Sequence, residues 1–179
     1  MKQLILIALG LFLLTNCADK KAVQQTALLA RIDSLENILL TDSLNISDEP
    51  ASEIIKAYLK FADTYPKDSS AADFLFKAAD VMRGMYRYQD AVQVLELVVT
   101  RYPKSDKAPA ALFYAGFILH ADTEQNMLAI PFFQRLIDEF PEHPLSNDAR
   151  NLMPLLNMNE EQLLDFLRQR NPDSSGLAS

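Results

Sequence analysis

The sequence is poor in glycine and cysteine and contains no tryptophan. Of its 179 residues, 4 are glycine and 1 is cysteine. Hairpin turns need residues that accept a positive φ, glycine above all, so this composition argues against an all-β sandwich or barrel. A single cysteine can form neither an internal disulfide nor a metal site built from several cysteines.

The chain also has fewer basic than acidic residues. The chain has 17 Lys and Arg against 24 Asp and Glu, which gives a net charge of −7. This balance argues against nucleic acid as a partner and against electrostatic binding to anionic lipid headgroups. Hydrophobic residues make up 49% of the chain. That share is enough for a buried core, and the length is that of one domain.

The N-terminal residues have the features of an export signal. Met1 and Lys2 give a short positive start, and residues 4–14 form an uninterrupted apolar run. Crossing a bilayer takes roughly 20 apolar residues, so this run is too short to be a transmembrane helix. It matches the apolar region of a secretory signal peptide. The only cysteine of the chain, Cys17, stands three residues after the end of this run.

The Leu-Thr-Asn-Cys stretch that ends at Cys17 resembles the lipobox of bacterial lipoproteins. The resemblance implies a lipoprotein signal peptide over residues 1–16, a lipid on Cys17 and a lipid-anchored tether over residues 17–25. It also implies the periplasmic side of a Gram-negative envelope, and Ala18 favours the outer membrane. The alternatives are an ordinary signal peptide with an incidental cysteine, or an uncleaved membrane anchor.

Residues 26–46 are predicted to form an amphipathic helix. Its apolar positions recur at steps of 4, 3, 4 and 7 residues, which places them along one stripe. They are Leu28, Ile32, Leu35, Leu39 and Ile46. Two interpretations stay open. Either this stripe packs on the fold that follows, or it forms a self-associating coil that makes the protein a homo-oligomer.

The rest of the chain repeats itself. An aromatic residue and a proline stand together at Tyr65-Pro66, Tyr102-Pro103 and Phe140-Pro141, at intervals of 37 and 38 residues. Apolar or small residues stand 4, 5, 8 and 11 positions before each proline, so they share one face of a helix. Because proline cannot continue a helix from within, each of these three helices is predicted to end at its proline.

These repeats resemble the tetratricopeptide repeat, a helix–turn–helix unit of 34 residues. One copy runs over residues 72–105, and a second runs over about 109–142 with one residue inserted near 122–126. Residues 53–66 resemble the second helix of an earlier, degenerate copy, whose partner would be the helix at 26–46. The resemblance implies an all-α, tetratricopeptide-like α-solenoid of antiparallel helix pairs over residues 51–170.

The ends of this fold are predicted to be atypical, because terminal repeats must cap the stack. The amphipathic helix stands at the N-terminal end. A C-terminal cap helix is expected after Ser146, and residues 171–179 are expected to form a flexible tail.

No catalytic or metal-binding pattern is found. The histidines, His120 and His143, lack metal-ligand spacing, and neither a phosphate-binding loop nor a nucleophile motif occurs. We therefore expect no enzyme activity, no metal and no cofactor.

The tetratricopeptide resemblance implies a partner groove lined by the first helix of each repeat. The groove positions carried over are Phe76, Lys77, Asp80 and Arg83 in the first copy and Phe113, Tyr114, Phe117 and His120 in the second. The lysine and asparagine clamp of the chaperone-tail-binding members is absent from these positions, so a terminal carboxylate is not expected to bind in that way. The alternative is that the aromatic side chains are buried against a cap helix.

Taken together, these features resemble the small tetratricopeptide lipoproteins and periplasmic proteins of outer-membrane assembly and envelope coordination, the BamD and CpoB types. That resemblance implies a protein–protein interaction scaffold attached to a membrane through Cys17, with another envelope protein or peptide as its partner. A self-associating structural envelope protein is the alternative. An enzyme or a carrier of a small ligand is a third interpretation, against which stands the lack of a clustered site.

Overall fold

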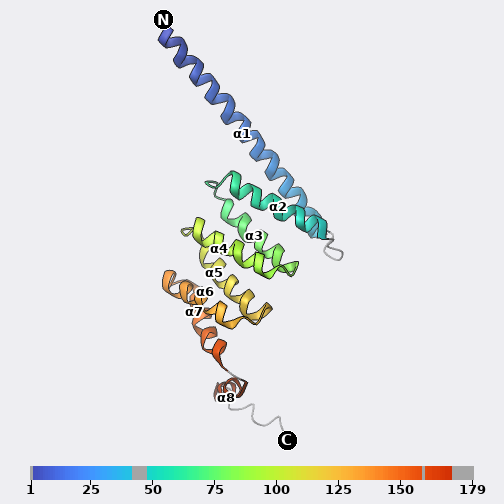
Figure 1. The fold of residues 1–179 in the computed structure, drawn as a ribbon, viewed down its shortest axis with the longest axis vertical. Coiled ribbons are helices and arrows are strands. Elements are labelled where there is room, and N and C mark those ends of the chain that lie inside the picture. The colour runs from blue at the N-terminus through green and yellow to red at the C-terminus, as the bar shows by residue number, and fades with distance from the viewer. Residues whose placement is uncertain (1, 42–47, 159, 171–179) are drawn as a thin grey trace. The chain divides into compact units, whose positions relative to one another are not determined.

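A computed structural model describes residues 2–41, 48–158 and 160–170, and within them every element is a helix (Figure 1). The helices are α1 (Lys2–Thr41), α2 (Asp48–Thr64), α3 (Ala71–Gly84), α4 (Tyr88–Arg101), α5 (Lys107–Phe117), the π-helix η1 (Ile118–Asp122), α6 (Asn126–Glu139), α7 (Pro144–Leu152), the 3₁₀ helix η2 (Met153–Asn157) and α8 (Glu160–Arg170). This confirms the all-α prediction. None of the described helices has the length and apolar character needed to cross a membrane. The predicted helix end at Ile46 and the predicted tail lie outside the described residues.

The chain divides into two compact units, residues 1–85 and residues 86–179. In the first unit, α2 turns back along the C-terminal half of α1 (Figure 1) and packs against both α1 and α3. On α1, Ile32 is completely buried, and Leu28, Leu35 and Leu39 are half-buried. The predicted apolar stripe is thus used within the chain, and self-association through it would require α1 to leave α2.

Polar contacts continue this packing toward the N-terminus. Gln25 Nε2 donates to Asp68 Oδ2 at 2.6 Å, and the Tyr65 hydroxyl donates to the backbone oxygen of Lys21 at 3.4 Å. Residues 17–25, predicted as a tether, lie inside α1 in the structure. The physical reason is that Ala, Lys and Gln dominate this segment and favour helix, and neither glycine nor proline interrupts it.

Helices α2 and α3 share an aromatic core. The Phe74 ring stacks on Tyr58 at 5.3 Å between centroids and meets Phe61 edge-on at 4.8 Å. Phe61 and Ile54 are both completely buried. Ile54 stands where a small alanine is usual in the repeat, yet α2 still forms its helix pair with α1.

The aromatic–proline corners have one shared geometry. At each corner the backbone N–H of the aromatic residue donates a hydrogen bond to the backbone carbonyl four residues earlier, which ends the helix. Two further backbone hydrogen bonds then lead into the next helix. The two further bonds are Asp68 to Tyr65 and Ala71 to Asp68 at the first corner, Ser105 to Tyr102 and Ala108 to Ser105 at the second, and His143 to Phe140 and Ser146 to His143 at the third, all between 2.9 and 3.1 Å. The predicted helix ends are confirmed.

In the second unit, α5 packs against α4 on one side and α6 on the other. The approach of α5 to α6 depends on Gly116, because a Cβ atom placed there would lie 2.8 Å from the Phe133 ring. Phe133 itself is completely buried. Helix α7 continues the stack by packing against α6 and α5, and its buried Ser146 hydroxyl donates to the backbone oxygen of Phe140 at 2.6 Å.

The extra residue of the second repeat is taken up by the π-helix η1. The predicted insertion was near residues 122–126, whereas the wider turn begins at Ile118. The turn before α4 and the turn before α6 have the same backbone feature, because Tyr86 and Glu124 both have a positive φ, at 61° and 55°. These two residues are 38 positions apart, as are Pro103 and Pro141. A π-turn accommodates one residue without changing the helices on either side.

Candidate partner-binding surfaces

The first-unit residues of the predicted groove are already engaged within the chain. Lys77 Nζ lies 2.9 Å from Glu36 Oε1 and 3.5 Å from Asp73 Oδ2, and it sits over the Phe74 ring at 5.6 Å. Phe76 and Arg83 are half-buried and Asp80 is exposed, and each of them takes part in an interaction inside the chain. Here the structure provides a polar network between α1 and α3 at the face where an open groove was predicted.

Glu36 is the centre of this network. It accepts the Tyr58 hydroxyl at 2.7 Å as well as the Lys77 ammonium. Burial alone would raise the pKa of Glu36, but the hydrogen bonds from Tyr58 and Lys77 and the charge of Lys77 together lower it. Burial would also lower the pKa of Lys77, yet Glu36 raises it. Glu36 and Lys77 therefore stay charged at neutral pH and tie α1 to α3.

The second-unit residues form an aromatic row on α5, made of Phe113, Tyr114 and Phe117. Phe113 stacks with Phe117 at 6.4 Å between ring centroids and meets the buried Phe133 of α6 edge-on at 5.6 Å. All three members of the row are half-buried, so one side of each takes part in the packing. The structure thus brings Phe113 and Phe117 together as predicted, with part of each side chain left exposed.

His120 lies inside η1, directly after α5. Its Nδ1 lies 2.7 Å from the side-chain oxygen of Asn126, the first residue of α6. This contact joins the two ends of the turn between the helices. The residues that the structure describes contain no group of three or more His, Cys, Asp or Glu side chains that could hold a metal ion.

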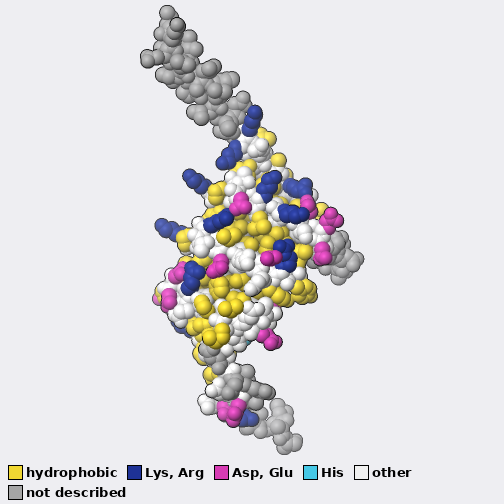
Figure 2. All heavy atoms as spheres, in the orientation of Figure 1, with side chains coloured by type: hydrophobic (Ala, Val, Ile, Leu, Met, Phe, Trp, Pro, Cys, Tyr) yellow, Lys and Arg dark blue, Asp and Glu magenta, His cyan; other side chains and the backbone are white. Residues whose placement is uncertain are grey.

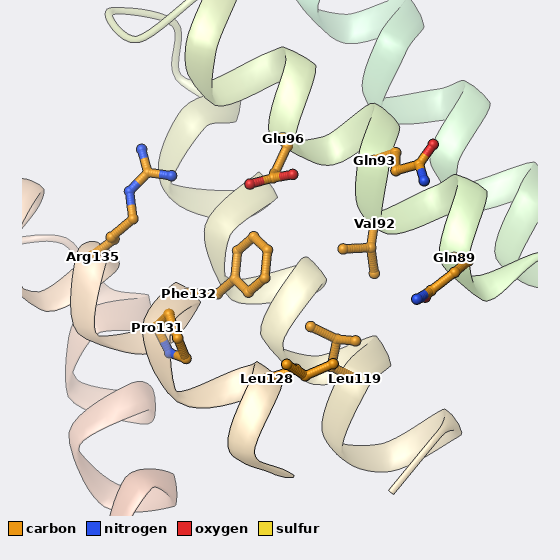
Figure 3. A pocket seen from close by; sticks show the side chains of 9 residues that line it. All are labelled: Gln89, Val92, Gln93, Glu96, Leu119, Leu128, Pro131, Phe132 and Arg135. Atoms are coloured by element: carbon orange, nitrogen blue, oxygen red, sulfur yellow. The ribbon is translucent and has the colours of Figure 1, made fainter. Parts of the chain in front are cut away.

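A surface that the sequence analysis missed is a cavity of about 360 Å³ between α4 and α6 (Figure 3). We call it the second-helix groove, because it lies on the second helix of each repeat. Its lining residues are Gln89, Val92, Gln93 and Glu96 of α4, Leu119 of η1, and Leu128, Pro131, Phe132 and Arg135 of α6. Each helix contributes positions i, i+3, i+4 and i+7, a spacing that sequence alone could have flagged as one stripe.

The geometry defines an all-α protein of repeated helix pairs with closely similar corners. The family model described as tetratricopeptide repeat matches residues 73–105 and 110–143. The matched stretches agree within one residue at each end with the copies predicted over 72–105 and 109–142. The match supports a tetratricopeptide-repeat protein and confirms the predicted fold class, a tetratricopeptide-like α-solenoid. None of the curated proteins compared with the chain matches it.

Tetratricopeptide repeats commonly bind protein partners and are typically scaffolds without enzyme activity. The repeats over 73–105 and 110–143 therefore indicate a protein–protein interaction scaffold.

Proposed function

We propose that the chain is a lipoprotein held at the periplasmic side of the outer membrane, where its repeats bind another protein of the cell envelope. The observation that carries the scaffold role is the aromatic row on α5. It lies on the first helix of the second matched repeat, which is where the tetratricopeptide resemblance locates partner binding. Half-buried aromatic side chains that are fixed by their packing are efficient anchors for a partner.

The proposed anchor rests on the sequence around Cys17. The apolar run over residues 4–14 ends three residues before the cysteine, and the resemblance to a lipobox assigns the lipid to that side chain. More than one acyl chain makes membrane attachment stable, since each buried CH₂ contributes about 0.8 kcal/mol. The acidic balance of the whole chain therefore does not oppose the proposal.

The contacts of α1 begin close to the predicted anchor. Lys21 and Gln25 follow Cys17 by about one and two helical turns, and both contact the corner between α2 and α3. Figure 2 shows Lys and Arg side chains (dark blue) on this part of the molecule, with Asp and Glu side chains (magenta) among them. Under this proposal, the first unit stands close to the membrane surface.

The anchor is tested by metabolic labelling with a radioactive or clickable fatty acid. The wild-type chain should incorporate the label and fractionate with membranes, and Cys17→Ala should lose the label. Thr15→Ala, which leaves the cysteine in place, is the matched control. Continued labelling of Cys17→Ala would show that the lipid assignment is wrong.

The scaffold role is tested at Phe117, the C-terminal member of the aromatic row. Phe117→Glu should abolish capture of the envelope partner in cell crosslinking while leaving the melting temperature close to that of the wild type. Tyr86→Glu is the control, because Tyr86 is 79% exposed and lies outside the row. A large fall in melting temperature for Phe117→Glu would instead show that the row is structural.

A further inference from the structure

The second-helix groove is bounded by matching walls. The α4 wall consists of positions 89, 92, 93 and 96, and the α6 wall consists of positions 128, 131, 132 and 135. Seven residues of helix rise by about 10 Å, so each wall is roughly two turns long. Both walls belong to the second unit, and η1, which supplies the floor residue Leu119, packs against α4 and α6.

The groove has an apolar centre and a polar rim. Val92, Leu119, Leu128 and Phe132 surround its middle in Figure 3, while the glutamine and charged side chains extend from its edges. Leu128 is 52% exposed, although large apolar side chains in this unit are otherwise mostly buried. Val92 and Leu119 are already buried, so a partner that covers Leu128 and the half-buried Phe132 would remove their apolar surface from water. Such burial is the main source of binding energy at protein interfaces.

The charges of the rim do not cancel. Arg135 Nε is 2.9 Å from Glu139 Oε1, so its charge is compensated inside α6. Within the part of the chain that the structure describes, the Glu96 carboxylate takes part in no ion pair, and its side chain is exposed. The rim therefore offers one uncompensated negative charge beside the apolar centre.

A ligand of the groove must satisfy its own backbone hydrogen-bonding groups, and this favours a helix over an extended peptide. An extended peptide would lay unpaired N–H and C=O groups over the apolar floor, where Gln89 and Gln93 could satisfy only a few of them. A helix pairs its own backbone groups and presents only side chains. Two helical walls about two turns long match the helix-in-groove mode of recognition.

We infer that the second-helix groove binds an amphipathic helix of a partner protein, with apolar side chains one turn apart and a Lys or Arg placed against Glu96. The apolar pair fills the centre around Leu128 and Phe132, and the cation pairs with the free carboxylate. This surface is separate from the aromatic row on α5, and the inference does not depend on the lipid anchor. It gives the scaffold a second binding face of different chemistry.

The test uses a displayed pool of designed helical peptides of about 16 residues, or roughly four turns. The peptides carry varied apolar residues at i and i+4 and Lys, Arg, Gln, Asp or Glu at the flanking positions. A second pool carries a central proline, which prevents helix formation. The bait is the full chain, and binding of selected peptides is measured by fluorescence anisotropy.

Selection on the wild type should enrich helical peptides with a flanking Lys or Arg. Leu128→Glu should weaken the selected peptides by about tenfold or more, because a charge then occupies the apolar centre. Glu96→Lys should reverse the preference toward Asp or Glu. Met127→Glu is the matched control, since Met127 is 72% exposed, adjoins Leu128 and does not line the groove.

Several results would overturn the inference. One is the absence of enrichment from the helical pool, and another is equal enrichment from the proline pool. Unchanged affinity in Leu128→Glu, with a melting temperature equal to that of the wild type, would also overturn it. So would a dimer of the wild type that dissociates on Leu128→Glu, because the groove would then hold a second copy of the chain.

Discussion

The helix pairs α1–α2 and α5–α6 are held together by different means. The α5–α6 contact is apolar and tight, with the buried Phe133 ring against Gly116 and Phe113. The α1–α2 contact has Ile32 as its one completely buried residue on the described part of α1, and it adds polar contacts such as Tyr58 to Glu36. The contact within the matched repeat therefore depends on close apolar packing, whereas the contact of α1, the helix that contains Cys17, depends on charge as well.

This difference has a consequence for function. A tightly packed α5 holds the aromatic row in one geometry, which suits the recognition of a partner. Helix α1 is held by contacts that respond to pH and salt, so its attachment to the repeats can be varied without touching the core of the second unit.

The largest expected effect is in the α5–α6 contact. Phe133→Ala removes a completely buried ring and should lower the free energy of unfolding by about 3–5 kcal/mol. Urea unfolding followed by circular dichroism measures it. Gln134→Ala, at an exposed neighbouring position of α6, is the control. A loss below about 1 kcal/mol would mean that this contact is not the core of the unit.

A smaller effect is expected in the α1–α2 contact. Ile32→Ala removes the buried centre of the stripe and should cost about 2 kcal/mol, the low end for such changes, because half-buried neighbours can close around it. Faster hydrogen exchange should appear in residues 25–41. The substitution Ile38→Ala is the control, since Ile38 is 42% exposed. If α1 exchanged no faster than in the wild type, the stripe would not be what holds it.

The next effect in size concerns Glu36 and is the one that depends on pH. The lowered pKa of Glu36 means that its charged form stabilises the fold above its ordinary value of 4.5, and this contribution is lost as the pH falls through the lowered value. Glu36→Gln should therefore lower the free energy of unfolding by about 1–2 kcal/mol at pH 7. It should have no effect at a pH below the lowered pKa of Glu36, where the carboxyl group is protonated. Unfolding curves of wild type and variant at several pH values measure the difference.

Arg31→Ala is the comparison for Glu36→Gln. The Arg31–Glu53 pair also joins α1 to α2, but its side chains are 59% and 38% exposed, so solvent screens it. We expect a loss below about 1 kcal/mol that disappears in high salt. A larger loss for Arg31→Ala than for Glu36→Gln would contradict the idea that the half-buried network is the main polar link.

Much of the fold could be predicted because its signals are local. The aromatic–proline pairs mark three helix ends, and the steps of 4 and 3 residues from Leu28 to Leu39 predict the stripe that packs on α2. The continuation of helix through residues 17–25 was not predicted, because those residues are polar without an apolar period. These residues form a helix because of their intrinsic helix propensity and because Gln25 and Lys21 contact Asp68 and Tyr65.

The surfaces were harder to predict for physical reasons. Lys77 looked available from its place in the repeat, but its partner Glu36 is 41 residues away and comes from the helix outside the matched repeats. The second-helix groove depends on the distance between α4 and α6 and on η1 beneath them. No spacing within either helix reveals that distance. The aromatic row was predictable because its members stand on one turn of one helix.

The central claim, that the repeats present a partner-binding surface, is tested most directly by photo-crosslinking in intact cells. Phe117→p-benzoylphenylalanine and Tyr86→p-benzoylphenylalanine are compared in the otherwise unchanged chain. One adduct of discrete mass is expected from position 117, and it should be absent from position 86 and lost when Phe113→Glu is added. The same adducts from both positions, or none from position 117, would contradict this claim.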